Sequence, residues 1–219
     1  MRGFLIAAAI SAVTAAPAAA QTDRAYVSGF GGFTVSPDTT SADALGEVGV
    51  RIAPRLFAFG DIGQFHNLQP STLQPTVDST VGTLGSQGLI VTGNARVPAW
   101  YGLGGLRYDI PSRGRVLPYV SGGIGFARLT PSAQFVYSSG TLPDGSTPVS
   151  GDDVTSQLIT AGDFTTPAAT NAFMFSLGGG VSVPVARQWF VDAGYRFARI
   201  QADTPVNANG ATFGVSYRF

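Results

Sequence analysis

His66 is the only side chain in the sequence that could act as an ordinary general base, because it is the single histidine and there is no cysteine. With Glu47 and one of the many serines it could form a hydrolase site, in which imidazole takes the proton of a nucleophilic hydroxyl. Along a strand, however, side chains alternate between two faces. If Asp61 faces inward, His66 has the opposite parity, whereas Glu47 shares the inward parity of Arg51. We therefore expect no catalytic site.

Metal and cofactor sites are not expected either. One histidine and no cysteine cannot build a thiolate or multi-histidine centre. Acidic side chains between Leu129 and Ala186 could bind calcium weakly, but their spacing fits no calcium-binding loop and predicts solvated surface charge. These residues are Asp144, Asp152, Asp153 and Asp163. The glycine runs at 122–123 and 178–180 lack the lysine and the hydroxyl residue of a phosphate-binding loop.

The overall charge excludes another class of partner. The chain has 13 arginines, no lysine and 13 acidic residues, so the formal net charge is zero. Nucleic-acid binding requires a basic excess that neutralises phosphates, and none is present.

The N-terminus is typical of a secretory signal peptide. Arg2 precedes the apolar stretch Phe4 to Ala16, and Ala18-Ala19-Ala20 precedes Gln21. Small residues at this spacing are what signal peptidase cuts, so residues 1–20 are expected to be removed and the mature chain to be 21–219. No later apolar run reaches the length of a membrane-spanning helix.

The rest of the chain predicts strands that position the remaining charged side chains. Eight stretches of alternating apolar and small or polar residues are bounded by proline, asparagine, aspartate and serine clusters. They cover Ala25 to Val35, Ala42 to Ala53, Leu56 to Leu68, Val97 to Ile110, Val116 to Leu129, Ala172 to Val185, Gln188 to Gln201 and Asn209 to Phe219. The pattern leaves the faces of the first, third and fifth stretches open. Strands of nine to eleven residues are the length that a bilayer requires.

Short links join the second and third, fourth and fifth, and sixth and seventh stretches, whereas residues 69–96 and 130–171 form long connections that we expect to lack regular structure. Long loops on one side and short turns on the other are typical of an outer-membrane barrel. The predicted fold is therefore all-β: an eight-stranded antiparallel up-and-down transmembrane barrel.

Six charged residues at parities assigned inward, three acidic and three basic, are predicted to form a neutral network in the lumen. An arginine facing lipid at mid-membrane would cost about 2 to 4 kcal/mol, so the lumen is the cheaper place. The six are Glu47, Arg51, Asp61, Arg107, Asp192 and Arg196.

Several segments resemble the small outer-membrane β-barrel family related to the barrel of outer membrane protein A. They are Gly105-Leu106-Arg107-Tyr108, Pro118 to Gly123, Asp192 to Arg196 and the terminal Tyr217-Arg218-Phe219. The alternating end of the chain, Phe213, Val215, Tyr217 and Phe219, is similar to the last-strand signal that the barrel assembly machinery reads. The resemblance implies a monomeric barrel in the bacterial outer membrane, in contact with its lipid and lipopolysaccharide.

The family includes adhesins, structural anchors, small channels and a few lipid-modifying enzymes, so it implies no single activity. We predict a non-enzymatic scaffold for surface loops, serving adhesion, surface recognition or envelope integrity, with an external ligand that the sequence does not identify. The alternatives are a small pore for ions or apolar solutes, a lipid-modifying enzyme, and a soluble β-sandwich or lipocalin-like binder. Arginines near the outer strand ends, Arg96, Arg128 and Arg199, are possible lipopolysaccharide contacts. Five aromatic residues are expected to form an interfacial girdle at the periplasmic strand ends. These are Trp100, Tyr108, Tyr119, Trp189 and Tyr217.

Overall fold

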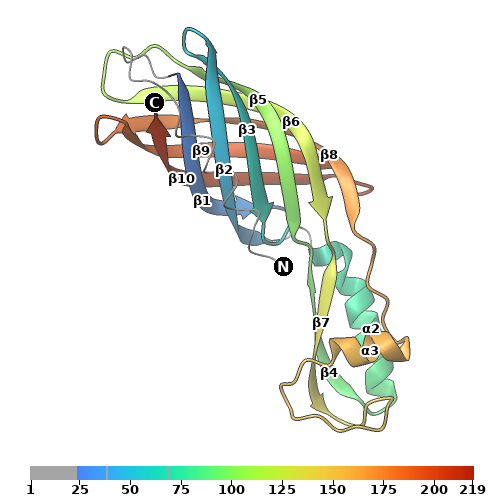
Figure 1. The fold of residues 1–219 in the computed structure, drawn as a ribbon. Coiled ribbons are helices and arrows are strands. Elements are labelled where there is room, and N and C mark those ends of the chain that lie inside the picture. The colour runs from blue at the N-terminus through green and yellow to red at the C-terminus, as the bar shows by residue number, and fades with distance from the viewer. Residues whose placement is uncertain (1–23, 38, 69) are drawn as a thin grey trace.

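Eight long strands form a closed antiparallel barrel in the computed structural model, which describes residues 24–37, 39–68 and 70–219. Around the barrel the strands follow the order β1-β10-β9-β8-β6-β5-β3-β2 (Figure 1). Their bounds are β1 Ala25–Val35, β2 Thr40–Ala53, β3 Leu56–Phe65, β5 Ala99–Asp109, β6 Leu117–Leu129, β8 Thr170–Pro184, β9 Trp189–Gln201 and β10 Val206–Arg218. The predicted fold class is confirmed, and each predicted stretch overlaps one barrel strand.

Burial along the strands follows the period of two that the sequence predicts. On β8, Met174 and Ser182 are fully buried in the lumen, whereas Phe173 and Leu177 on the other parity are exposed on the outer wall. The same division settles the three strands whose faces were open. The lumen receives Tyr26, Ser28 and Thr34 from β1, Phe57, Phe59 and Phe65 from β3, and Tyr119, Ala127 and Leu129 from β6.

The first and last strands close the barrel. Tyr26 on β1 pairs with Arg218 on β10, and the pairing runs along both strands to Val35 and Asn209. Beyond β10, Phe219 accepts hydrogen bonds from the backbone N–H groups of Arg24 and Ala25 and donates one to Ala25. Closure leaves no unpaired edge among these strands, which is the condition for placing a sheet in hydrocarbon.

Connections at the two ends of the barrel differ. The end that carries Arg24 and Phe219, here called the turn end, has short links. The link between β2 and β3 is two residues long, and its second residue, Arg55, has a positive φ of 65°. At the opposite end, here called the outer end, residues 36–39 and 202–205 also form short links. The remaining two connections at the outer end are the long ones.

The long connections contain regular structure, which corrects the expectation of structureless loops. Together they form an outer subdomain that projects from the barrel (Figure 1). Its elements are η2 Pro70–Thr72, α2 Gln74–Ser86, β4 Ile90–Arg96, β7 Ser132–Ser139 and α3 Thr155–Ala161. Strands β4 and β7 pair with each other and prolong the β5–β6 ladder; Pro98 and Pro131, which have no N–H to donate, separate the two ladders. Among the described residues, no helix is long and apolar enough to cross a bilayer.

A second hydrophobic core holds the outer subdomain together. Val77 and Leu84, seven residues apart on one face of α2, are buried against β4. Gly93 on β4 allows this approach, because a Cβ at that position would collide with the side chain of Val77. The other buried members come from all parts of the subdomain: Leu73, Leu89, Val91, Ala95, Phe135, Tyr137, Leu142, Val154, Leu158 and Phe164.

Excising residues 141–165 should leave the barrel folded and open the outer subdomain. The segment holds α3 and contributes Leu142, Val154, Leu158 and Phe164 to the second core, whereas the barrel lumen is filled by a separate cluster. We expect heat-modifiable gel mobility to be retained and chymotrypsin to cleave near Phe135 and Tyr137 at least tenfold faster. Chymotrypsin is used rather than trypsin, because residues 70–95 and 132–169 contain no arginine or lysine at which trypsin could cleave. Loss of heat-modifiable mobility would show instead that the barrel depends on this segment.

Candidate functional site

Arg107 on β5 is the centre of the charged layer near the turn end of the lumen. Its guanidinium lies 3.2 Å from the carboxylate of Asp109, 3.5 Å from that of Asp192 and 3.9 Å from that of Glu47. It also donates a hydrogen bond of 2.8 Å to Ser182. Because only 2% of the side chain is exposed, these partners replace its hydration shell. The five N–H donors and planar fork of arginine suit a position with several acceptors.

Aromatic rings complete the surroundings of this guanidinium. Its central carbon lies 3.7 Å from the ring centroid of Tyr119 and 5.2 Å from that of Tyr26. The Tyr26 hydroxyl donates a hydrogen bond of 2.6 Å to Glu47. Cation–π contact with two rings stabilises a charge that has left water.

The carboxylate of Asp192 on β9 is satisfied mainly by hydroxyl groups. Ser182 on β8 and Ser216 on β10 both donate hydrogen bonds to it, and Ser28 on β1 donates to Ser216 at 2.8 Å. Asp192 is completely buried. The hydroxyls therefore connect three neighbouring strands to one buried charge, which is the arrangement that makes burial of a carboxylate tolerable.

A second charged layer lies farther toward the outer end and centres on Arg196 of β9. Arg196 donates hydrogen bonds to Asp61 at 2.6 Å, to Ser176 at 2.7 Å and to the Tyr101 hydroxyl at 3.2 Å. Asp61 and Tyr101 belong to β3 and β5, on the far side of the lumen from β9 in the strand order. The Arg196–Asp61 pair therefore crosses the barrel from wall to wall.

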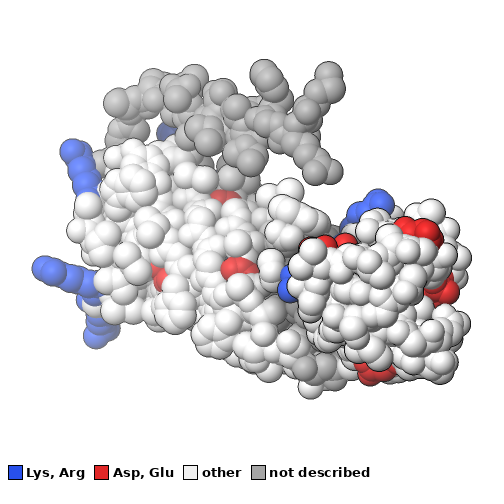
Figure 2. Space-filling model, turned by 90° about the horizontal axis from the view of Figure 1, so that it is seen from below, with Lys and Arg blue, Asp and Glu red and all other residues white. Residues whose placement is uncertain are grey.

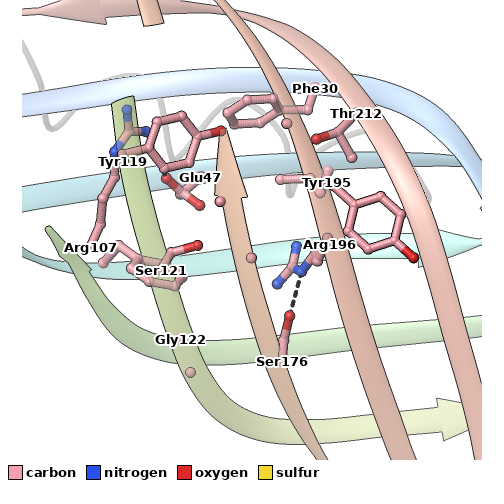
Figure 3. A pocket seen from close by; sticks show the side chains of 16 residues that line it. Phe30, Glu47, Arg107, Tyr119, Ser121, Gly122, Ser176, Tyr195, Arg196 and Thr212 are labelled. Carbon is pink, nitrogen blue, oxygen red and sulfur yellow. Dashed lines mark hydrogen bonds and ion pairs between the residues drawn. The ribbon is translucent and has the colours of Figure 1, made fainter. Parts of the chain in front are cut away.

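A small chamber of about 40 Å³ lies between the two layers. Figure 3 shows Arg107, Tyr119 and Glu47 toward one side of it and Arg196 with Ser176 toward the other. Glycines 122, 123, 178, 179 and 194 form part of its wall. A polar space of this size holds a few water molecules at most.

The outer half of the lumen is filled mainly by apolar side chains, but it also holds the buried carboxylate of Asp43 on β2, which accepts a hydrogen bond of 2.9 Å from the Thr34 hydroxyl. Leu68 follows β3 and turns into the lumen, where it is fully buried; Ser36 donates a hydrogen bond to its carbonyl oxygen. Around it lie Val97, Ala99, Leu129, Met174, Ile200 and Val206, all buried. The lumen thus contains two charged layers and an apolar plug in series.

Five of the six predicted lumen charges join these layers, and one does not. No ion pair connects Arg51 to a carboxylate in the part of the chain that the structure describes. Its guanidinium carbon lies 5.3 Å from the Phe57 ring centroid, and its buried Nε has no hydrogen-bond partner. Glu47 bonds to Tyr26 instead, so parity placed Arg51 correctly inward but could not pair it.

Asp109 and Arg218 were missed by the sequence analysis although they extend the Arg107 layer. Arg218 lies 3.1 Å from Asp109, and its guanidinium carbon lies 4.2 Å from the ring centroid of Phe190. Both residues have the inward parity of their strands, which was the available signal. Asp109 shares the parity of Arg107, and Arg218 alternates with the outward residues of the last strand.

His66 lies just beyond the end of β3 and is exposed, whereas Glu47 is in the lumen and 11% exposed. The two groups that a hydrolase would combine are therefore on opposite faces. This agrees with the parity argument against a catalytic pair.

Two of the five girdle residues are not where they were predicted. Trp100 is exposed on the wall near the outer end of β5, opposite Arg128 on β6, because β5 starts at that end. Tyr119 points into the lumen and is 8% exposed. Tyr108, Trp189 and Tyr217 lie near the turn end on the outward parity, as predicted, and the rings of Trp189 and Tyr217 are 5.1 Å apart.

The three rim arginines lie at or next to the outer end of the barrel. Arg96 ends β4, and Arg128 is on β6 between Trp100 and Asn171 of the adjoining strands; both are exposed. Arg199 on β9 is half-buried and donates a hydrogen bond of 3.4 Å to Asn207. The barrel thus spreads them over several strands rather than gathering them in one cluster.

The surface of the outer subdomain is acidic. Figure 2 shows acidic side chains over it, and Asp78, Asp144, Asp152, Asp153 and Asp163 are all exposed. Asp153 accepts hydrogen bonds from the backbone N–H of Thr155 and from the amide of Gln134, each 3.0 Å. Hydrogen bonding, chiefly by Thr155, lowers the pKa of Asp153 below its ordinary value, so it stays charged at neutral pH.

Comparisons with known proteins agree on the fold. The family model for the outer membrane protein beta-barrel domain matches residues 5–219. Neisserial surface protein A has a solved structure with a TM-score of 0.54 and 16% identity, over 89% of this chain and 97% of that one. The N-terminal barrel domain of OprF from Pseudomonas aeruginosa gives a TM-score of 0.52 and 12% identity, over 90% and 98% of the two chains. No curated protein matches the sequence. The chain belongs to the outer-membrane β-barrel family, whose members reside in the bacterial outer membrane.

Proposed function

We propose that this protein is a non-enzymatic outer-membrane scaffold with a closed lumen, which holds a folded outer subdomain at the cell surface for adhesion, surface recognition or envelope integrity. The observation that carries the proposal is the second hydrophobic core, which orders 70–96 and 132–164 into one unit. A permanently ordered surface loses little conformational entropy on binding, which favours recognition of a partner. In this proposal residues 1–20 are removed on export, and the external ligand is unidentified.

The closed lumen supports a scaffold rather than a pore. An eight-stranded barrel is just wide enough for side chains to fill its interior. Here the Arg107 layer, the Arg196–Asp61 pair and the plug around Leu68 follow one another along the axis. An ion would have to displace all three in turn.

In planar bilayers the native protein should therefore show no steady conductance. The reason is that opening a path would break the Arg196–Asp61 contact of 2.6 Å and expose the apolar side chains around Leu68. A bacterial porin added to the same bilayer serves as the positive control. Stable, reproducible conductance steps from the native protein would favour the small-pore alternative and contradict the closed lumen.

Absence of enzymatic activity is tested separately. Expression of the protein should leave the mass profile of lipid A unchanged, because His66 and Glu47 lie on opposite faces of the barrel wall. A deacylated or otherwise altered lipid A that disappears in a His66→Gln variant would replace the scaffold by a lipid-modifying enzyme.

A further inference from the structure

A groove of about 460 Å³ runs over the outside of the barrel wall on β3, β5 and β6. Its floor is Gly102, which lies between Ile62 and Phe126 in the strand register. These neighbours are 64% and 67% exposed, so they rise on either side of a position that has no side chain. Two residues along the strands toward the turn end, Gly60 pairs with Gly104. A second groove of about 430 Å³ begins at Gly104.

The polar end of the groove lies two residues along the strands from Gly102, toward the outer end. There the register aligns Gln64, Trp100, Arg128 and Asn171 across β3, β5, β6 and β8. Arg128 and Asn171 line the groove, and both are exposed. Within the residues that the structure describes, no ion pair neutralises Arg128.

The apolar row contains Ile62, Gly102 and Phe126, and the polar row beside it contains Trp100, Arg128 and Asn171. An apolar row next to a polar row matches the boundary between hydrocarbon and headgroups. Tryptophan is enriched at that boundary, and arginine there can reach toward phosphate. A guanidinium and an amide side by side offer charge-assisted hydrogen bonds to a phosphate oxygen. The apolar row below them offers a channel for an acyl chain.

We propose that this groove is a specific site for one phosphorylated lipid of the outer leaflet, with its phosphate on Arg128 and Asn171 and an acyl chain over Gly102. The site is separate from the outer subdomain and does not depend on its role. A second copy of the chain is a poorer occupant, because apposed Arg128 side chains would place like charges together.

The first pair of variants tests the acyl channel. Gly102→Val should fill the groove without strain, since a Cβ at Gly102 would have only the Asp61 carbonyl oxygen near it, at 3.9 Å. Gly31→Val is the matched control: Gly31 is also outward on the wall, outside both grooves, and a Cβ there would likewise meet only one carbonyl oxygen at 3.9 Å. The second pair tests the phosphate contact, with Arg128→Gln against Arg187→Gln, which removes the same charge from an exposed arginine in the turn-end link between β8 and β9.

The measurement is native mass spectrometry of the folded full chain in detergent, titrated with diphosphoryl lipid A. The native protein should retain one lipid, and Gly102→Val and Arg128→Gln should each weaken binding about tenfold, while the two controls stay within about twofold. Excess inorganic phosphate should not displace the lipid. Equal loss in the controls would show non-specific annular lipid and overturn the site, as would complete displacement by phosphate. Dimers that disappear in Gly102→Val would overturn it in favour of a subunit interface.

Discussion

Replacing Arg107 with methionine should lower the free energy of unfolding by about 3 to 5 kcal/mol, the cost of breaking a buried ion pair by removing one partner. Methionine keeps much of the length of the side chain but leaves Asp109, Asp192 and Glu47 without their shared cation. Since Asp192 is completely buried, water cannot compensate for that loss. The measurement is urea unfolding of the protein folded in lipid vesicles, followed by tryptophan fluorescence and heat-modifiable gel mobility.

Arg187→Met is the control for this experiment, because Arg187 is an exposed arginine in the link between β8 and β9. It should change stability by less than about 0.5 kcal/mol. Adding Asp192→Asn to Arg107→Met should restore part of the stability, since it removes one of the uncompensated charges. An Arg107→Met variant that unfolds at the native urea midpoint would mean that the layer is hydrated and weakly coupled.

Deleting Phe219 should sharply reduce the amount of folded protein in the outer membrane, by about tenfold or more, and raise periplasmic aggregates. Phe219 makes three backbone hydrogen bonds with Arg24 and Ala25, where the first and last strands meet. Its loss leaves unpaired backbone groups at the barrel seam, which hydrocarbon penalises. Outer-membrane fractionation with heat-modifiable mobility measures the folded yield.

A Phe219→Ala variant separates the two roles proposed for this residue. The backbone ladder remains, whereas the ring, 6.0 Å from that of Tyr217, is lost. If the aromatic end is a signal for the assembly machinery, the alanine variant should fold normally in purified lipid vesicles but accumulate poorly in cells. Normal yield of the deletion variant in cells would remove support for both roles.

Local alternation was enough to predict the barrel strands and, on five of the eight, the direction of their side chains. A strand repeats every two residues, and a wall with lipid on one side and a filled lumen on the other imposes opposite chemistry on the two parities. The inward positions of Arg107, Asp192 and Arg196 could therefore be read without any long-range information. Parity says nothing about distance, however, which is why Arg51 was grouped with charges that it does not contact.

The sequence by itself determined the eight strands and the faces of five of them, because these follow from periodicity within each strand. The resemblance to outer-membrane barrels rested on particular segments, above all the alternating end at Phe219. Only the tertiary structure decided what the long connections do. Residues 74–86 alternate poorly and are rich in serine, threonine and glycine, and their helix depends on Val77 and Leu84 packing on β4. Strands β4 and β7 are far apart in sequence and pair because the β5–β6 ladder below them sets their register. Contacts between distant segments stabilise this subdomain, and no local pattern contains them.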